Sequence, residues 1–320
     1  MIRKIFNYLK YFCNLKKELI VNLKNCSEFM KNGKYQLFPK QAVLNSNFTE
    51  NFYNNLFIKL CFNQKITIFS EKKQFNGIKM LITNQKNIKI FSEKEILTFA
   101  SKKEIDDLLK IYSKISNFFK FPKILKQTDI YYIEEYIKDE KEKNLAELYE
   151  IYKIVLNFYK YQKTEYLNIK TNLIDMNRLS KENKYFIRDL IESYDKEYPF
   201  VLSHNDLHFE NVLKNNSKYY FIDWEYFGFN IFFYDFLNIL FIPALEGNNE
   251  FLHRYLNGDF DDMFKKLFDL FEINFLTKDR LKYIKIYLLQ KIILRDIQES
   301  TQHLNKTLLK YQVALKGLNC

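Results

Sequence analysis

The spacing of apolar residues changes in character along the chain. Over residues 1–32, apolar residues such as Ile5, Leu9 and Phe12 recur every three or four positions with lysines between them, which predicts a helix. From about Lys65 the apolar residues form short β-branched runs, KITIF, GIKMLIT and NIKIF, separated by polar stretches. These runs predict antiparallel strands joined by tight turns.

Helical spacing returns in SKKEIDDLLKIYSKISNFF, residues 101–119. Ser101 is expected to be its N-cap, because Glu104 follows three positions later as in a capping box. The runs FPKIL and DIYYIEEYI then predict two more strands.

The C-terminal part is predicted to be mainly helical with one polar interruption. Amphipathic spacing covers residues 146–162, 183–198 and much of 247–320. It is broken by VLSHNDLHFENVL, residues 201–213, and KYYFIDWE, residues 218–225, where short strand-like runs flank polar residues. The order of elements predicts an α+β protein of two lobes with a cleft between them.

The predicted organisation has three parts. Residues 1–60 form an N-terminal, mostly helical extension, and residues 61–138 form an N-terminal lobe with a small antiparallel sheet and one helix. Residues 139–320 form a helical C-terminal lobe that holds the polar loop. A chain of 320 residues is long enough to bury a substantial core in this arrangement.

The chain is basic, but its charge does not identify a partner. The net charge of +11 suits nucleic acid, an anionic membrane surface or a phosphorylated substrate, yet the lysines are spread along the chain and no nucleic-acid-binding motif occurs. Nucleic acid is therefore not expected. The basic amphipathic N-terminus is expected to pack on the protein itself, with peripheral membrane association as the alternative.

Cysteine usage and hydropathy point to a cytoplasmic protein. The four cysteines show no paired spacing, so neither a disulfide framework nor a zinc site is suggested. No apolar run approaches the ~18 residues that a membrane span needs. The aromatic fraction of 18% is weak evidence for a ligand pocket, because Phe and Tyr are abundant throughout the chain together with Lys, Asn and Ile.

The polar interruption contains the residue types that phosphoryl transfer from a nucleotide requires. A carboxylate must orient the acceptor hydroxyl and take its proton, and hard oxygen ligands must hold Mg²⁺ against the phosphates. Asp206 can be the carboxylate that takes the proton, and Asn211 and Asp223 can be the oxygen ligands of Mg²⁺. A loop between two short strands could bring Asn211 back towards Asp206, with Asp223 on the next strand alongside.

The same residues carry a family resemblance. HNDLHFEN matches H-x-D-x-x-x-x-N of the kinase catalytic loop, and HNDL…ENVL followed by IDWEY-x-G-x-N…YD resembles the aminoglycoside phosphotransferase and choline/ethanolamine kinase superfamily. Trp-Glu after Asp223, in place of Phe-Gly, is similar to the small-molecule branch, and bacterial choline-kinase-like proteins in particular. The resemblance, over residues 201–238, implies a protein-kinase-like fold, ATP and Mg²⁺ as cofactors, and Asp206 as the catalytic base.

On the nucleotide side, the resemblance implies an ion pair in the N-terminal lobe. Lys89 is the candidate for the strand lysine that grips the α- and β-phosphates, and Glu104 is the candidate for the helix glutamate that steadies it. Lys79 and Glu95 are the alternatives. Each of these residues could also be only a solvated side chain.

YYIEEYI resembles the strand and hinge that meet the adenine ring. Glu135 and Ile137 would offer backbone groups there, although the segment also fits an ordinary buried strand end. A glycine-rich phosphate loop is not evident, because only Gly77 lies in the expected hairpin.

The remaining candidates concern the loop itself and the acceptor. By the resemblance, His204 buttresses the loop and Asp235 hydrogen-bonds back to it. Trp224 and Glu225 could meet a cationic acceptor, but Trp224 could equally be core packing. A zinc site that uses His204 and His208 is disfavoured, because an irregular loop lacks the helical register that aligns i and i+4.

The acceptor stays open. An amino alcohol such as choline or ethanolamine is the first choice, and a sugar or surface-glycan or lipopolysaccharide precursor is the alternative. An aminoglycoside is disfavoured because a polycation prefers an acidic pocket. A different class, a catalytically silent kinase-like binding module, is disfavoured by the presence of all three chemical positions.

Overall fold

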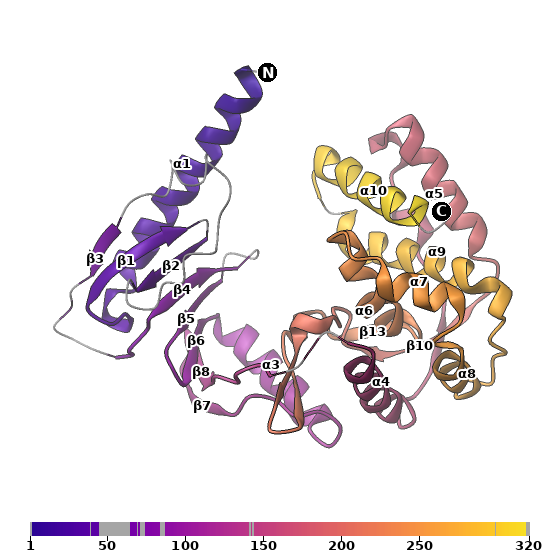
Figure 1. Cartoon of the computed structure of the whole chain (residues 1–320), viewed down its shortest axis with the longest axis horizontal. Helices are drawn as coiled ribbons and strands as arrows, with labels where there is room; N and C mark the ends of the chain where they lie inside the picture. Colours follow the sequence, from indigo (N-terminus) through magenta and orange to yellow (C-terminus); the bar gives the residue numbers. More distant parts are fainter. Residues whose placement is uncertain are drawn as a thin grey trace. The chain divides into compact units, whose positions relative to one another are not determined.

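The computed structural model describes residues 2–38, 40–44, 65–68, 70, 74–83, 87–140, 142, 144–297 and 299–317. The chain divides into two compact units (Figure 1). The N-unit comprises Met1–Lys114 and Phe121–Lys138, and the C-unit comprises Ile115–Lys120 and Asp139–Cys320.

The N-unit contains an antiparallel sheet of eight described strands in the order β3-β1-β2-β4-β5-β6-β8-β7. The strands are β1 (Gly33–Phe38), β2 (Gln41–Leu44), β3 (Lys65–Ile68), β4 (Lys79–Ile82), β5 (Ile88–Phe91), β6 (Glu95–Phe99), β7 (Ile124–Gln127) and β8 (Tyr131–Glu135). Each of the five runs that predicted strands contains one, and α3 (Lys102–Ile115) follows β6 behind Ser101.

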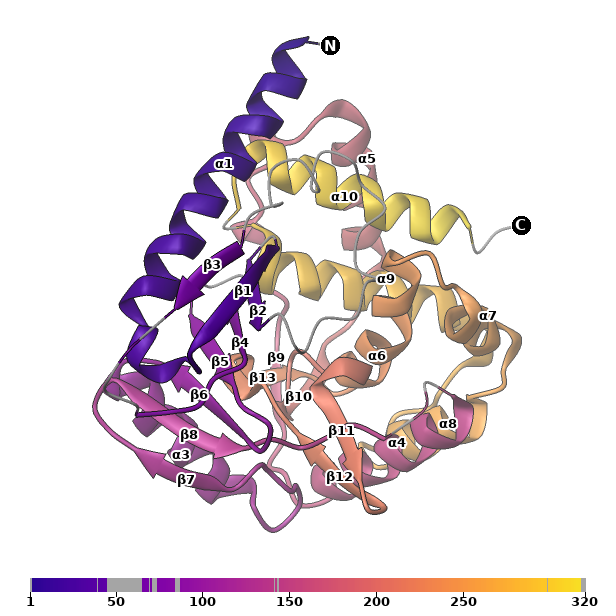
Figure 2. The same ribbon diagram turned by 60° about the vertical axis from the view of Figure 1, so that its left-hand side comes forward.

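Helix α1 (Ile2–Asn25) lies across one face of this sheet (Figures 1 and 2). Leu15, Leu19 and Leu23 recur at the helical interval of four and are buried in one cluster with strand residues such as Tyr35 and Met80. The apolar stripe of this part of the helix therefore belongs to the core of the N-unit. No helix within the described ranges is long and apolar enough to cross a membrane.

The first part of the chain differs from the mostly helical extension expected over residues 1–60. Residues 33–44 form β1 and β2, which are joined to the sheet through β3 and β4, while residues 45–60 lie outside the described residues. Tyr35 and Leu37 alternate into the core, and the Tyr35 hydroxyl donates to the carbonyl of Gly77 at 2.7 Å. These strands are short, and their stability comes from distant partners rather than from a local pattern.

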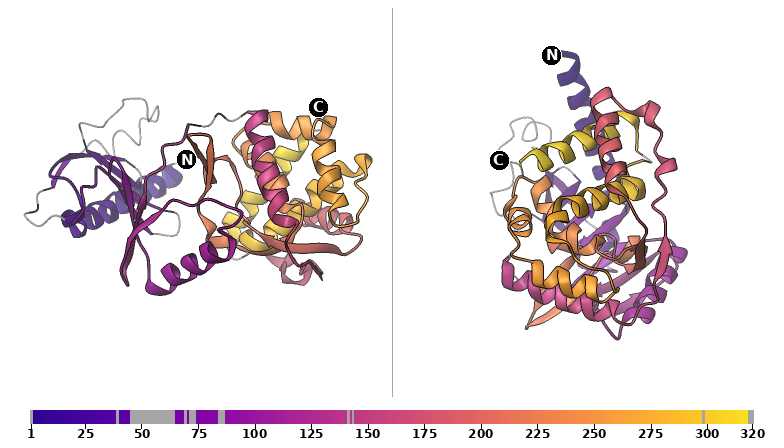
Figure 3. Two further views of the ribbon diagram at one scale, coloured as in Figure 1. Left: turned by 90° about the horizontal axis from the view of Figure 1, so that it is seen from below. Right: turned by 90° about the vertical axis from the view of Figure 1, so that its right-hand side faces the viewer.

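The C-unit is mainly helical (Figure 3). Its helices are α4 (Leu145–Tyr159), α5 (Lys181–Ser193), α6 (Tyr234–Leu245), α7 (Glu250–Asn257), α8 (Asp261–Asp269), α9 (Arg280–Lys291) and α10 (Thr301–Lys316). Helix α9 contacts α5, α6 and α7, and the first eight residues of α6 are all buried. The antiparallel sheet of the N-unit and the helices of the C-unit have the α+β, protein-kinase-like fold expected from the sequence.

Two small antiparallel sheets of the C-unit carry the polar segment. One has the order β13-β10-β9 and the other pairs β11 with β12. Their strands are β9 (Glu165–Leu167), β10 (Tyr198–Ser203), β11 (Val212–Asn215), β12 (Lys218–Phe221) and β13 (Gly228–Ile231).

Aromatic residues build much of the C-unit core. Phe233 stacks on Phe268 with ring centroids 5.8 Å apart, and Tyr283 packs on both rings. The high aromatic content of the chain therefore serves packing to a large extent.

Candidate active site

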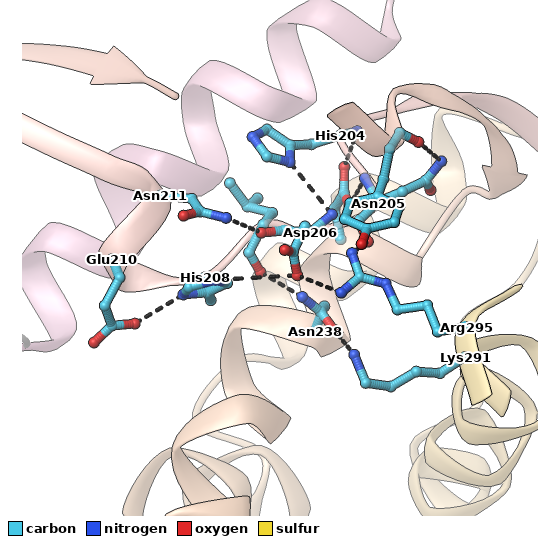
Figure 4. A network of polar contacts seen from close by, with 12 residues as sticks. His204, Asn205, Asp206, His208, Glu210, Asn211, Asn238, Lys291 and Arg295 are labelled. Atoms are coloured by element: carbon cyan, nitrogen blue, oxygen red, sulfur yellow. Dashed lines mark hydrogen bonds and ion pairs between the residues drawn. The ribbon is translucent and has the colours of Figure 1, made fainter. Parts of the chain in front are cut away.

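The segment that follows β10 forms a compact loop, and several side chains hydrogen-bond to the backbone of this loop (Figure 4). It passes through Asn205, whose φ of 66° is left-handed, a conformation that asparagine tolerates better than most residues. A short 3₁₀ turn, Phe209–Asn211, then returns the chain, and Asn211 Nδ2 donates to the carbonyl oxygen of Asp206 at 2.9 Å. Asp206 and Asn211 are thus joined directly.

Asp235, in the first turn of α6, holds the start of this loop. Its carboxylate accepts hydrogen bonds from the backbone N–H groups of His204 (2.8 Å) and Asn205 (3.0 Å) and from the Tyr159 hydroxyl (3.2 Å). Burial raises the pKa of Asp235 to about 6, although the two backbone donors act in the opposite direction. The carboxylate fixes two consecutive backbone amides immediately before Asp206.

His204 connects the loop to the next strand. Its Nε2 lies 2.8 Å from the carbonyl oxygen of Ile222, and its Nδ1 accepts the backbone N–H of Asp206 at 3.3 Å. A carbonyl can only accept, so Nε2 carries the proton and the ring is neutral. Burial lowers the pKa of His204 to about 4, which keeps this tautomer in place at neutral pH.

Asp223 lies two residues after the end of β12, and the backbone next to it is bonded to Asn211. Val212 pairs with Phe221, and the N–H of Ile222 donates to the carbonyl of Asn211 at 3.0 Å. Asp223 is exposed and has a φ of 59°. A non-glycine residue in this region costs about 1–2 kcal/mol, and such residues cluster at functional sites.

The residues present fit a magnesium ion. Because Asn211 Nδ2 donates to Asp206, its Oδ1 is left for a ligand, and Asp223 supplies a carboxylate. Carboxylate and amide oxygens suit Mg²⁺, which binds through one or two protein groups together with phosphates and waters. Among the described residues, no group of three or more His, Cys, Asp and Glu could hold a metal by itself.

Arg295 contacts the loop from a distant part of the chain. It lies in a π-helical turn, Ile292–Asp296, that continues α9, and its Nη1 is 3.0 Å from Oδ1 of Asp206 (Figure 4). Its Nη2 donates to the carbonyl oxygen of Asn205 at 2.9 Å. The sequence reasoning missed this residue; the available signal was two cations four residues apart in the apolar run LLQKIILRD.

Lys291, the other cation, supports the loop through Asn238. Lys291 Nζ and the Tyr287 hydroxyl both donate to Asn238 Oδ1, at 2.9 and 2.7 Å, and Asn238 Nδ2 donates to the carbonyl of Leu207 at 2.8 Å. Burial lowers the pKa of Lys291 to about 8. Helix α9 therefore reaches the backbone on the C-terminal side of Asp206 through α6.

His208 and Glu210 contact each other within the loop, and of the two only Glu210 is exposed. His208 Nδ1 is 2.8 Å from Glu210 Oε2, while His208 Nε2 is 4.0 Å from Asp206 Oδ1. His208 therefore borders the carboxylate of Asp206 without forming a hydrogen bond to it.

A family model for choline/ethanolamine kinase matches residues 86–253, more than half of the chain. The chain belongs to the choline/ethanolamine kinase family. The match includes β10, the loop, Asp223 and Asp235, and thus the segment on which the sequence resemblance rested. A comparison with curated proteins gave no match.

Solved structures with similar arrangements include several kinases. A choline/ethanolamine kinase family protein from Mesorhizobium loti is 13% identical over 72% of this chain and 84% of its own, with a TM-score of 0.46. Choline kinase from Cryptosporidium parvum Iowa II is 15% identical over 77% and 88%, with a TM-score of 0.43. Glucosamine kinase in complex with glucosamine, ADP and inorganic phosphate is 10% identical over 75% and 79%, with a TM-score of 0.47.

The two acceptor candidates of this family member, Trp224 and Glu225, have different surroundings. Trp224 is only 1% exposed, donates from Nε1 to the carbonyl of Phe221 at 3.0 Å, and lies 4.4 Å from the His204 ring. It can orient His204, but it has no surface to offer an acceptor. Glu225 is exposed.

The two nucleotide candidates of the N-unit lie on different elements, Lys89 on β5 and Glu104 at the start of α3. Lys89 lies on β5 between Leu81 of β4 and Thr98 of β6. Glu104 accepts from the backbone N–H and the hydroxyl of Ser101, both at 2.7 Å. Both bonds go to Oε2; they lower the pKa of Glu104 and complete the capping box at the start of α3.

The alternatives and the hinge candidates also have defined surroundings. Lys79 Nζ lies 5.3 Å from the Phe91 ring centroid, and burial lowers its pKa. Glu95 begins β6 opposite Glu135, whose N–H donates to the carbonyl of Lys123 within the sheet, so this amide is already bonded. Ile137 is buried and lies in the sequence one residue before Lys138, the last residue of the N-unit.

Proposed function

We propose that this family member is an ATP-dependent kinase that transfers the γ-phosphate to a hydroxyl group of a small molecule. The observation that carries the proposal is the hydrogen bond from Asn211 to the backbone of Asp206, with Asp223 just beyond the end of the neighbouring strand. Phosphoryl transfer needs a positioned carboxylate and oxygen ligands for Mg²⁺ at such a site. Family membership supports the same reaction class.

In the proposed mechanism, Asp206 orients the acceptor hydroxyl and accepts its proton. The acceptor oxygen forms a bond to the γ-phosphorus as the bond from phosphorus to the bridging oxygen breaks, and ADP leaves. Asn211 and Asp223 would hold Mg²⁺, which neutralises charge on the phosphates when bound. His204 stays neutral and keeps the backbone of Asp206 in place, and Asp235 fixes the residues before it.

Lys89, Glu135 and Ile137 remain proposals for the nucleotide side. Lys89 would contact the phosphates, and backbone groups near Ile137 would meet the base. Both bonds from Ser101 go to Oε2 of Glu104, so its Oε1 can still accept from a lysine, and we propose Lys89 with Glu104 as the pair to test first.

The first acceptor class is an amino alcohol such as choline or ethanolamine, on the basis of the family. Glu225 is exposed near Asp223 in sequence and would suit a cationic head group. Trp224 is too buried to take part.

The site also favours a second acceptor class, a neutral polyhydroxyl compound such as a sugar. A lone carboxylate attracts an ammonium ~4 Å away by about 4 kcal/mol at an effective dielectric of about 20, and a guanidinium paired with that carboxylate cancels most of this attraction. Arg295 is paired in this way with Asp206 and also lies 3.9 Å from the Tyr226 ring centroid. A quaternary ammonium would therefore meet a neutralised carboxylate and an aromatic face already covered by a cation.

A coupled ADP-release assay with Mg²⁺ and ATP tests the proposal across choline, ethanolamine, hexoses, heptoses and aminoglycosides. We expect acceptor-dependent ADP release that is lost in Asp206→Asn, while this variant still binds Mg·ATP. Asp223→Ala is expected also to weaken Mg²⁺-dependent nucleotide binding. Binding of Mg·ATP without transfer to any acceptor would favour a catalytically silent binding module instead.

A further inference from the structure

Arg295 has the surroundings of a built-in part of the site. Its side chain is 22% exposed and makes two polar contacts to the loop, one to the side chain of Asp206 and one to the carbonyl of Asn205. Its guanidinium packs on the ring of Tyr226. Three contacts from one planar group leave Arg295 little freedom to move.

The contact is selective for one oxygen of Asp206. Nη1 lies 3.0 Å from Oδ1, whereas Oδ2 has no hydrogen-bond partner in the described part of the chain. The Asp206 side chain is 18% exposed, so a small molecule can reach it. An arginine that holds Oδ1 leaves Oδ2 as the oxygen that can accept a proton from an acceptor hydroxyl.

The support behind Arg295 is rigid. Lys291 lies one helical turn earlier and is bonded to Asn238, which holds the next residue of the loop, Leu207. The segment between the two cations is a π-helical turn, a feature that often occurs at functional sites. The end of α9 thus contacts the loop on both sides of Asp206.

We propose that Arg295 is a positioning residue for the reaction: it holds Oδ1 of Asp206 so that Oδ2 faces the acceptor hydroxyl. This proposal rests on the proposed role of Asp206 as the base. A misplacement of about 1 Å at a reacting group can cost on the order of 100-fold in rate, so the effect of losing this contact is measurable.

The test compares Arg295→Met, which keeps the length without the charge, with Arg295→Lys, which keeps a charge without the planar fork. Arg188→Met is the matched control, because Arg188 is an exposed arginine on α5 of the same unit. We expect Arg295→Met to lower kcat on the order of 100-fold with the dissociation constant of Mg·ATP unchanged, Arg295→Lys to recover about a tenth of the lost activity, and Arg188→Met to behave as wild type.

A second readout does not depend on turnover. Carbodiimide labelling of carboxyl groups, followed by mass spectrometry at residue resolution, is expected to modify Asp206 several-fold faster in Arg295→Met than in wild type or Arg188→Met. Thermal melts show whether Arg295→Met is folded. If it is not, kcat and the rate of Asp206 labelling are measured on Arg295→Lys instead.

The two failures are distinguishable. If wild type transfers no phosphate, the proposed function fails, and faster labelling of Asp206 in Arg295→Met would still support the contact. Unchanged labelling of Asp206, or an unchanged kcat in a folded Arg295→Met variant, would overturn the proposal for Arg295 while leaving the kinase function intact.

Discussion

Replacement of Asp235 by asparagine removes a buried negative charge while keeping the size of the side chain. The carboxylate accepts from the backbone N–H groups of His204 and Asn205 and from the Tyr159 hydroxyl. Asparagine has one acceptor oxygen, so at least one backbone N–H loses its bond and faces an NH₂ group. An unsatisfied buried donor costs about 1–3 kcal/mol.

An opposing effect comes from the charge itself. Burial raises the pKa of Asp235 from 3.8 to about 6, which corresponds to about 3 kcal/mol in favour of the neutral form. Asparagine is neutral at every pH and avoids this cost. The two effects nearly cancel at pH 7. We therefore expect the free energy of unfolding of Asp235→Asn to equal that of wild type or to exceed it by up to about 2 kcal/mol.

The pH dependence isolates the charge. The raised pKa means that folded protein binds the Asp235 proton more tightly than unfolded protein, so this group's contribution to stability falls as the pH rises from 3.8 to about 6 and is constant above that. The variant lacks this term. The free energy of unfolding of Asp235→Asn minus that of wild type should therefore increase by about 2–2.5 kcal/mol between pH 4 and pH 7, as measured by urea denaturation.

Catalysis should respond differently from stability. With one of its two backbone anchors lost, the loop is expected to misplace Asp206, and kcat should fall on the order of 100-fold. Asp262→Asn is the control, because the Asp262 side chain is 95% exposed and the net charge changes equally. Full activity in Asp235→Asn, or a loss of stability above about 3 kcal/mol that does not vary with pH, would refute the reasoning.

Three further predictions concern other parts of the C-unit. Burial lowers the pKa of His204 to about 4, so the neutral ring contributes about 3 kcal/mol to the free energy of unfolding above pH 6.5, and this contribution is lost as the pH falls through 4. In urea denaturation, the stability of His204→Gln should lack this acid-sensitive part. A pH profile identical to that of wild type would contradict the prediction. Trp224 is the only tryptophan and is 1% exposed, so iodide should barely quench native fluorescence and a bound acceptor should leave it unchanged; strong quenching would place it at the surface. Arg280 Nε donates to Asp261 at 2.8 Å in a mostly buried pair, so Arg280→Ala should lower the free energy of unfolding by about 1.5–3 kcal/mol without changing kcat, and a changed kcat would connect this pair to the site.

Features that depend on neighbouring residues were predictable from the sequence. The capping box of Ser101 and Glu104 has the expected bond, because both partners lie within one helical turn. The runs of β3, β4 and β5 were visible for the same reason, since each strand carries its own apolar pattern. The spacing of the catalytic-loop motif likewise lies within a few residues, and the family model covers it.

Features that depend on distant partners were not predictable. Strands β1 and β2 are short, and their place in the sheet depends on pairing with β3 and β4. Arg295 lies 90 residues from Asn205, and the two cations in its apolar run do not indicate which distant segment they contact. The pairing of Lys89 with Glu104 stays a prediction, because it too depends on residues from separate elements, a strand and the start of a helix.

The central claim is that Asp206 serves as the base in transfer of phosphate from ATP to a small-molecule hydroxyl. Phosphorus NMR of a reaction that contains Mg·ATP and the best acceptor from the screen follows the new phosphate ester directly. Wild type should form the ester and ADP in equal amounts, while Asp206→Asn should bind Mg·ATP normally and form the ester at least about 100-fold more slowly. Ester formation by Asp206→Asn at the wild-type rate would contradict the claim.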